Sequence, residues 1–88
     1  MDERSSIDFV LKRILLGNVR QNVQMYHIEE DTDLVNELAL DSLFMVNLFV
    51  DLEEEFEIKI HAADLERPIL KKYKFLKEYV MEKISHKH

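Results

Sequence analysis

The chain has 88 residues, a formal net charge of -6, one glycine, one proline and no cysteine. This length suits one small domain and is too short for a catalytic cleft between two lobes. Few turn-forming residues disfavour a many-stranded sheet, so an all-α bundle is expected. Without cysteine the chain has no disulfide and no thiolate metal site. No apolar run approaches the length of a membrane span, which predicts a cytoplasmic protein.

Charge is distributed unevenly along the chain. Residues 29–66 hold thirteen Asp or Glu, whereas residues 71–88 hold six Lys against two Glu. The acidic centre would repel a phosphate backbone, so nucleic-acid binding is not expected. A basic partner surface fits this centre better. The alternative, that these charges only keep a small domain soluble, stays open.

The first predicted element is an amphipathic helix over about residues 6–16, with Ser5 or Ser6 as its N-cap. Its apolar residues recur at helical spacing: Ile7, Val10, Leu11, Ile14 and Leu15. The periodicity then fades from Gly17 to Asp33, which predicts a long loop. Four apolar residues are expected to attach this loop to the core: Val23, Met25, Tyr26 and Ile28. A short helical turn is predicted at residues 34–38.

The strongest helical pattern begins at Ser42 and continues to Phe56. One face of this helix should point toward the core, and it holds Met45, Leu48, Phe49, Leu52 and Phe56. A second apolar stripe, Leu43, Val46 and Val50, lies roughly 140° away around the helix, so both stripes cannot face one small core. We interpret the second stripe as an exposed partner surface. The alternative is a helix sandwiched centrally between others.

After Ile58 and Ile60, a short helical turn is predicted in "HAADLE" before Pro68, and a last helix over residues 71–84. The apolar face of that last helix holds Leu76, Tyr79, Val80 and Ile84. The predicted fold is therefore an all-α, monomeric four-helix bundle with a short third helix, and residues 85–88 form a frayed tail. The predicted core is Ile14, Leu15, Leu34, Leu38, Leu48, Leu52, Phe56 and Val80.

Two polar residues, Asp41 and Ser42, interrupt the apolar run "LALDSLFMV". Asp41 is suited to cap the helix, because its carboxylate accepts free N–H groups and complements the helix dipole. Ser42 then lies in the first turn, where capping does not need a second hydroxyl. A phosphate at this position would be stabilised by the helix N-terminus. From the residues alone, a serine that is merely tolerated there remains an open alternative.

Catalysis and metal binding are not expected. Ser42 lacks a G-x-S-x-G context, and outside the tail only His27 and His61 could act as its base. A calcium loop starting at Asp31 would need a glycine in place of Asn36 and a glutamate in place of Ser42. No metal site is predicted, since His86 and His88 in the tail would bind a metal only weakly.

The segment "DLVNELALDSLFMVNLFVDLEEEFEIKI" resembles the acyl carrier protein family, whose members carry D-S-L at the start of helix II. The resemblance is close over residues 28–60 and includes Val46, Leu48, Leu52, Phe56 and the Glu53–Glu55 triplet. It implies a non-catalytic carrier domain over residues 1–88. In the family the D-S-L serine bears 4'-phosphopantetheine derived from coenzyme A, so the resemblance assigns that role to Ser42. The arm would carry acyl or aminoacyl groups as thioesters.

The resemblance also implies partners: a phosphopantetheinyl transferase and the enzymes that load and condense the cargo. The expected cofactor site is Ser42 with Asp41, and the expected partner-binding residues are Leu43, Val46, Asn47, Val50, Glu53 and Glu54. The acidic run from Asp51 to Glu57 is predicted to steer basic enzyme surfaces toward the carrier.

Several positions depart from the pattern of fatty-acid carriers, which usually have a glycine and another small residue before the aspartate and acidic residues soon after D-S-L. Here those places hold Ala39, Leu40, Phe44 and Asn47. The chain therefore looks closer to discrete carriers of polyketide, peptide or other specialised pathways. Two rival hypotheses remain: an unmodified helical protein-interaction domain, and a regulatory bundle that binds a basic protein.

Overall fold

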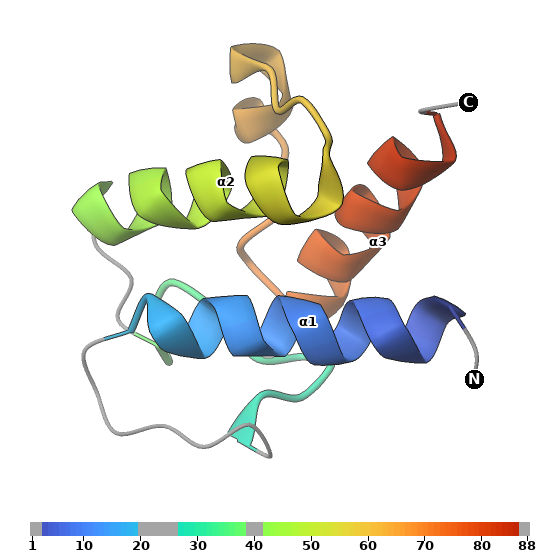
Figure 1. Ribbon diagram of the computed structural model, residues 1–88. Helices are drawn as coiled ribbons and strands as arrows, with labels where there is room; N and C mark the ends of the chain where they lie inside the picture. The colour runs from blue at the N-terminus through green and yellow to red at the C-terminus, as the bar shows by residue number, and fades with distance from the viewer. Residues whose placement is uncertain (1–2, 20–26, 39–41, 87–88) are drawn as a thin grey trace.

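The computed structural model describes residues 3–19, 27–38 and 42–86. Within these ranges the chain forms three α-helices, one 3-10 helix and no strand. The elements are α1 (Glu3–Gly17), α2 (Ser42–Phe56), η2 (Ala62–Glu66) and α3 (Tyr73–Ser85). In Figure 1, α1 and α2 lie one above the other, α3 runs obliquely from the middle of α1 past the C-terminal end of α2, and η2 lies above the C-terminal half of α2. Both α2 and α3 contact α1.

The core is built from the apolar stripes of the three α-helices and from the segments between them. Six residues predicted for it are buried: Leu15, Leu34, Leu38, Leu48, Leu52 and Val80. Ile14 and Phe56 are only partly buried and pack at its edge, because Ile14 lies beside the Leu11 and Leu15 stripe and Phe56 is the last residue of α2. The prediction was wrong to place these two inside. The predicted core also left out two buried tyrosines of α3, each 1% exposed: Tyr73, and Tyr79, which the helical pattern places on the apolar face of the last helix.

The first helix begins earlier than predicted. Ser5 and Ser6 lie inside α1, which starts at Glu3, so neither serine is its N-cap. Glu3 and Arg4 are good helix formers, and serine costs little within a helix, so the helix continues through the two serines toward the N-terminus. The predicted end near residue 16 is close to the observed end at Gly17.

The short third helix is a 3-10 helix rather than an α-helix, so the four-helix count is met only in part. η2 has five residues and ends at Glu66, and the next residue, Arg67, has an extended backbone with ψ 149. Pro68 follows directly, and a proline disfavours helical geometry in the residue before it. This local stop leaves η2 too short to develop regular α-helical bonding.

The loop before α2 is attached to the start of α3. Tyr73 N donates to Thr32 O at 2.8 Å, and Lys74 N donates to Glu30 O at 2.9 Å. The N-cap residue of α3, Lys72, makes no side-chain hydrogen bond to the helix. The loop carbonyls therefore accept hydrogen bonds from the first backbone N–H groups of α3, which have no partner within the helix. Within the loop, Ile28 is buried as predicted. Val23, Met25 and Tyr26 lie outside the described residues.

The predicted helical turn at residues 34–38 is present as a run of turns. Glu37 N donates to Asp33 O at 2.8 Å, the bond of one helical turn. The Asp33 carboxylate accepts the backbone N–H groups of Val35 and Asn36 at 3.1 and 3.0 Å. Leu34 N also donates to Leu70 O at 3.1 Å. The chain that leads toward Ser42 is therefore held by Asp33 and by the segment before α3.

At the C-terminus of α2, Glu57 adopts a left-handed backbone with φ 53. Ile58 N then donates to Glu53 O at 3.2 Å, the bond typical of a left-handed helix end that glycine favours. A non-glycine residue in this conformation costs roughly 1–2 kcal/mol. Replacing it by glycine would recover only part of this energy, because glycine loses more backbone entropy on folding.

We therefore expect Glu57→Gly to raise the free energy of unfolding by about 0.5–1 kcal/mol, measured by chemical denaturation. Glu54→Gly is the matched control, because Glu54 lies within α2 and glycine inside a helix costs about 1 kcal/mol. The two substitutions should therefore act in opposite directions. A loss of stability in Glu57→Gly as large as that in Glu54→Gly would contradict the assignment of strain to Glu57.

Candidate functional site

Ser42 is the first residue of α2 and its side chain is exposed. The first turn of α2 contains no acidic residue. Free backbone N–H groups and the positive end of the helix dipole therefore lie beside the Ser42 hydroxyl, with no first-turn carboxylate of α2 to oppose them. The predicted capping residue Asp41 lies outside the described residues.

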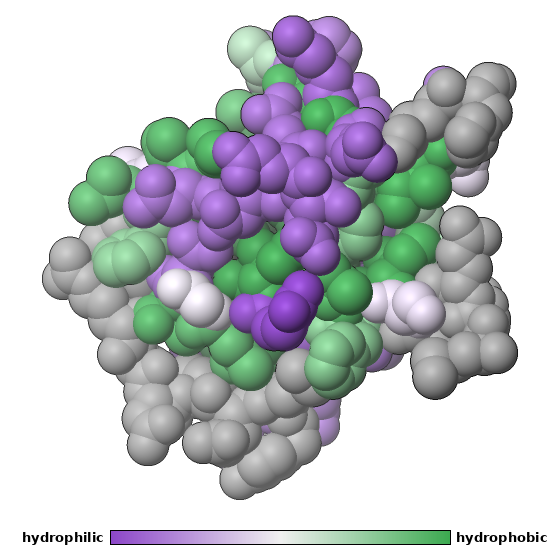
Figure 2. All heavy atoms as spheres, in the orientation of Figure 1, coloured by the Kyte–Doolittle hydropathy of each residue, from purple (hydrophilic) through white to green (hydrophobic). Residues whose placement is uncertain are grey.

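Beside Ser42, α2 presents an apolar strip that consists of Leu43, Val46 and Val50. These side chains are 62%, 59% and 45% exposed, so the second stripe of the helix does not face the core, and the predicted exposure is confirmed. Asn47 on the same side is also exposed. In Figure 2, hydrophobic side chains gather where α2 begins, whereas hydrophilic side chains cover the rest of α2 toward η2. The role of the strip in binding remains a prediction.

Several acidic residues of α2 are engaged within the protein. The Glu53 carboxylate accepts the backbone N–H of Ile60 at 2.8 Å, and the Asp51 carboxylate accepts the Asn18 side-chain amide at 3.0 Å. Glu55 pairs with Arg13 at 3.3 Å. Of the two acids predicted to bind partners, Glu53 is half-buried and Glu54 is exposed. The acidic run therefore also fastens α2 to its neighbours, a role that sequence reasoning did not assign.

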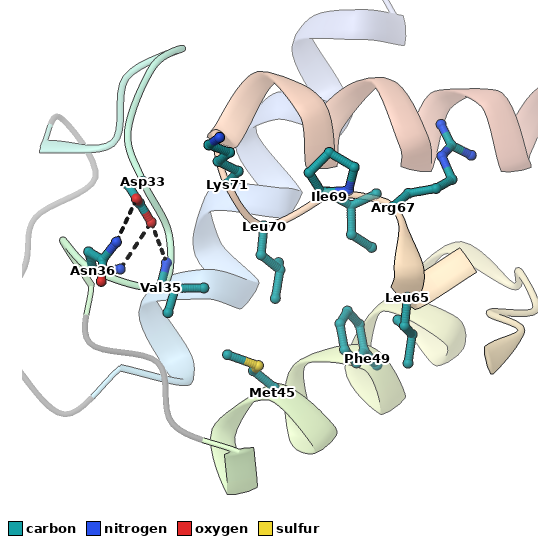
Figure 3. A pocket seen from close by; sticks show the side chains of 11 residues that line it. Asp33, Val35, Asn36, Met45, Phe49, Leu65, Arg67, Ile69, Leu70 and Lys71 are labelled. Atoms are coloured by element: carbon teal, nitrogen blue, oxygen red, sulfur yellow. Dashed lines mark hydrogen bonds between the residues drawn. The ribbon is translucent and has the colours of Figure 1, made fainter. Parts of the chain in front are cut away.

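A cavity of about 470 Å³ opens between α2, η2 and the turn that precedes α2. Figure 3 shows Met45 and Phe49 of α2 on one side and Leu65, Leu70 and Val35 around it. The lining is mainly apolar, and it consists of Asp33, Val35, Asn36, Met45, Phe49, Leu65, Arg67, Pro68, Ile69, Leu70 and Lys71. Sequence reasoning placed Met45 and Phe49 on the inward face but gave no sign of the cavity, because its other walls come from distant segments.

The cavity lies along the side of α2 that also bears Ser42. Met45 and Phe49 follow Ser42 by three and seven residues, and residues at these spacings share one face of a helix. A flexible group attached to the Ser42 hydroxyl would therefore start on the cavity side of α2.

Two of the three charged side chains that line the cavity, Arg67 and Asp33, are engaged with neighbouring residues; the third is Lys71. The Arg67 guanidinium lies 3.5 Å from the Glu82 carboxylate and points away from the cavity in Figure 3. The Asp33 carboxylate accepts bonds from Asn36, including its side-chain amide at 2.8 Å, and these bonds hold its pKa below the usual range. The interior is therefore suited to an apolar ligand more than to a charged one.

The histidines lie in separate segments. His27 lies in the loop between α1 and α2, His61 precedes η2 and His86 follows α3, and all three are exposed. His88 lies outside the described residues. None of the helices in the described ranges is both long and apolar enough to cross a membrane.

Comparison with known proteins identifies the family. A family model described as a phosphopantetheine attachment site matches residues 11–71, which include Ser42 and the strip. An acyl carrier protein of Thermotoga maritima is 34% identical over 67 residues, which cover 76% of this chain and 80% of that protein. An acyl carrier protein of Desulforapulum autotrophicum is 33% identical over 64 residues, which cover 73% and 82%. The chain thus belongs to the acyl carrier protein family and is a carrier with a covalent 4'-phosphopantetheine.

Proposed function

We propose that this chain is a single-domain, monomeric carrier, not itself an enzyme, in which Ser42 bears the 4'-phosphopantetheine arm. The observation that carries the proposal is the exposed Ser42 hydroxyl at the first position of α2. It lies within the region matched by the phosphopantetheine attachment model. We also infer that η2 takes the place of the short third helix in a four-helix carrier bundle.

The residues around Ser42 fit a phosphodiester. The first turn of α2 has no acid, and the helix N-terminus stabilises a negative charge placed beside it. When bound, the arm supplies a thiol that the chain itself lacks, because the sequence contains no cysteine. Ser42 offers the hydroxyl that a transferase joins to phosphopantetheine from coenzyme A, and α2 holds that hydroxyl at the surface.

The cavity favours an acyl cargo over a charged aminoacyl cargo. Its volume of about 470 Å³ lies within the range of roughly 300–1,000 Å³ common for small-molecule sites. Its apolar walls would shelter a hydrocarbon chain, whereas a buried ammonium group would lose its hydration, and the one carboxylate in the lining, that of Asp33, is already bonded to Val35 and Asn36. We therefore propose that the carrier holds acyl intermediates whose apolar end lies in this cavity.

The apolar strip is the proposed contact for the transferase and for the enzymes that load and condense the cargo. Leu43, Val46 and Val50 are exposed next to Ser42, and an exposed apolar patch beside a reactive group is a common form of protein-binding surface. Asn47 and Glu54 extend this surface, and Glu54 would steer basic partners.

Val46→Asp should therefore leave the melting temperature nearly unchanged while weakening transferase binding by about 1–3 kcal/mol, the scale of a central interface contact. The measurements are thermal unfolding of the isolated protein and the KM of the carrier in the transferase reaction. Ala63→Asp, at an exposed position of η2, is the control and should alter neither. A large loss of thermal stability in Val46→Asp would instead make Val46 part of the core, because a buried charge costs several kcal/mol.

The test of the function is the intact mass of the protein after incubation with coenzyme A and a broad-specificity phosphopantetheinyl transferase. We expect a gain of one phosphopantetheine, mapped to the peptide that contains Ser42. An unchanged mass would favour the alternative of an unmodified helical protein-interaction domain.

A further inference from the structure

The 3-10 helix η2 is held to the protein without a buried residue of its own. None of the residues of Ala62–Glu66 is buried. The nearest buried residues on either side are Ile58, 9% exposed, and Ile69, 4% exposed. Ile69 belongs to the core and the partly buried Ile60 packs against it, so apolar packing anchors the chain on both sides of η2, and η2 itself depends on other contacts.

Arg67, which follows η2, pairs with Glu82 of α3 at 3.5 Å and lies over the Tyr79 ring, 5.4 Å from its centre. Within η2 itself, the contacts converge on one carboxylate oxygen. Asp64 Oδ2 accepts the Tyr79 hydroxyl at 2.8 Å, the Lys83 ammonium at 2.9 Å and the backbone N–H of His61 at 3.2 Å. We call this group, Asp64 with Tyr79, Lys83 and the His61 amide, the Asp64 cluster. Two of its members belong to α3, so the cluster ties η2 directly to α3.

The α3 side of the cluster is rigid. Tyr79 is 1% exposed and belongs to the core, so its hydroxyl is a fixed donor. Hydrogen bonds from Lys83 and Tyr79 keep the pKa of Asp64 far below its usual range. The carboxylate therefore stays ionised at any physiological pH, and the cluster is a permanent contact of the folded chain rather than a pH-dependent one.

Asp64 is followed directly by Leu65, which forms one wall of the cavity. Leu65 is 46% exposed, and in Figure 3 it lies beside Phe49, at the end of the cavity away from Met45. Because Leu65 belongs to η2 and is only about half covered by its neighbours, its position follows that of η2. Any movement of η2 away from α3 would displace this wall and widen the cavity.

We propose that Asp64 is a positioning residue of the cargo cavity, whose contacts with Tyr79 and Lys83 hold η2 and Leu65 over the cavity. Loss of these contacts lets η2 move outward between Ile60 and Ile69 while the core of α1, α2 and α3 stays folded. That the cavity receives the acyl chain rests on the proposed function, but the attachment of η2 by Asp64 does not.

The first test is hydrogen exchange on the unmodified protein. Asp64→Ala should speed exchange of the Arg67 amide, which donates to Asp64 O at 3.1 Å, by about tenfold or more through local opening. Tyr79→Phe should give a smaller increase, since it removes only the hydroxyl. Core amides of Leu11, Leu52 and Leu76 should exchange as in the wild type. Glu66→Ala, which removes another acid of η2, is the matched control and should change none of these rates.

The second test uses loaded protein and compares two cargo lengths. Octanoyl and acetyl thioesters on the phosphopantetheine arm are cleaved with hydroxylamine, and the rates are followed by mass spectrometry. Asp64→Ala should speed cleavage of the octanoyl form several-fold, because the widened cavity holds the octanoyl chain less well. The increase in the cleavage rate should follow the increase in the fraction of molecules whose chain lies outside the cavity. The acetyl form is too short to be sheltered, so its cleavage rate should equal that of the wild type.

The outcomes separate the two proposals. The positioning role of Asp64 would be overturned if the Arg67 amide exchanged at the wild-type rate in both Asp64→Ala and Tyr79→Phe. It would also be overturned if the exchange rates of the core amides rose as much as that of Arg67. Equal acceleration of octanoyl and acetyl cleavage would overturn its link to the cavity. A wild-type protein that cannot be loaded would overturn the proposed function alone, while the exchange data would still decide the role of Asp64.

Discussion

Ser42→Ala is expected to abolish loading with phosphopantetheine and to leave the fold intact. The side chain is exposed at the first position of α2, so its loss should change the free energy of unfolding by no more than about 0.5 kcal/mol. Without the hydroxyl no bond to the phosphate can form. The measurement is the intact mass after incubation with coenzyme A and the transferase, paired with thermal unfolding.

Ser85→Ala is the matched control, because Ser85 is an exposed serine at the end of α3. It should gain the same mass as the wild type. The Ser42→Ala protein still carries Leu43, Val46 and Val50, so it should inhibit loading of the wild type as a competitor for the transferase. A mass gain in Ser42→Ala would show that the arm is attached elsewhere.

Leu52→Ala is expected to produce the largest loss of stability. Leu52 has 0% exposure and packs in the core of α2 with α1 and α3. Truncating a fully buried leucine to alanine costs roughly 2–5 kcal/mol, through the lost burial and the remaining cavity. Domains of this size are stable by only about 5–15 kcal/mol, so this change could bring the protein close to unfolding.

The matched control is Val50→Ala, two residues earlier on the exposed strip, where the side chain is 45% exposed. Its effect should stay within about 0.5 kcal/mol, as for most surface substitutions. Denaturant unfolding of both variants compares the two apolar stripes of α2 directly. Equal losses in the two variants would contradict the division of α2 into a buried face and a partner-binding strip.

The sequence by itself determined what depends on local spacing. The helical period separated Leu48 and Leu52 from Leu43, Val46 and Val50, and burial follows that division, because neighbours three and four residues apart share a helix face whatever surrounds them. The position of Ser42 at the start of α2 was predictable for the same reason, since helix-start signals lie within a few residues of one another.

Only the tertiary structure decided the features that join distant segments. The cavity beside Ser42 is formed by residues between 33 and 71, Thr32 and Glu30 cap α3, and Glu53 binds Ile60 rather than solvent alone. The Asp64 cluster likewise needs α3 to bring Tyr79 and Lys83 to η2. Periodicity reports which side of an element is apolar, but it does not say which other element meets that side or leaves a gap there. Such contacts arise only when the helices pack, since packing alone brings these side chains within bonding distance.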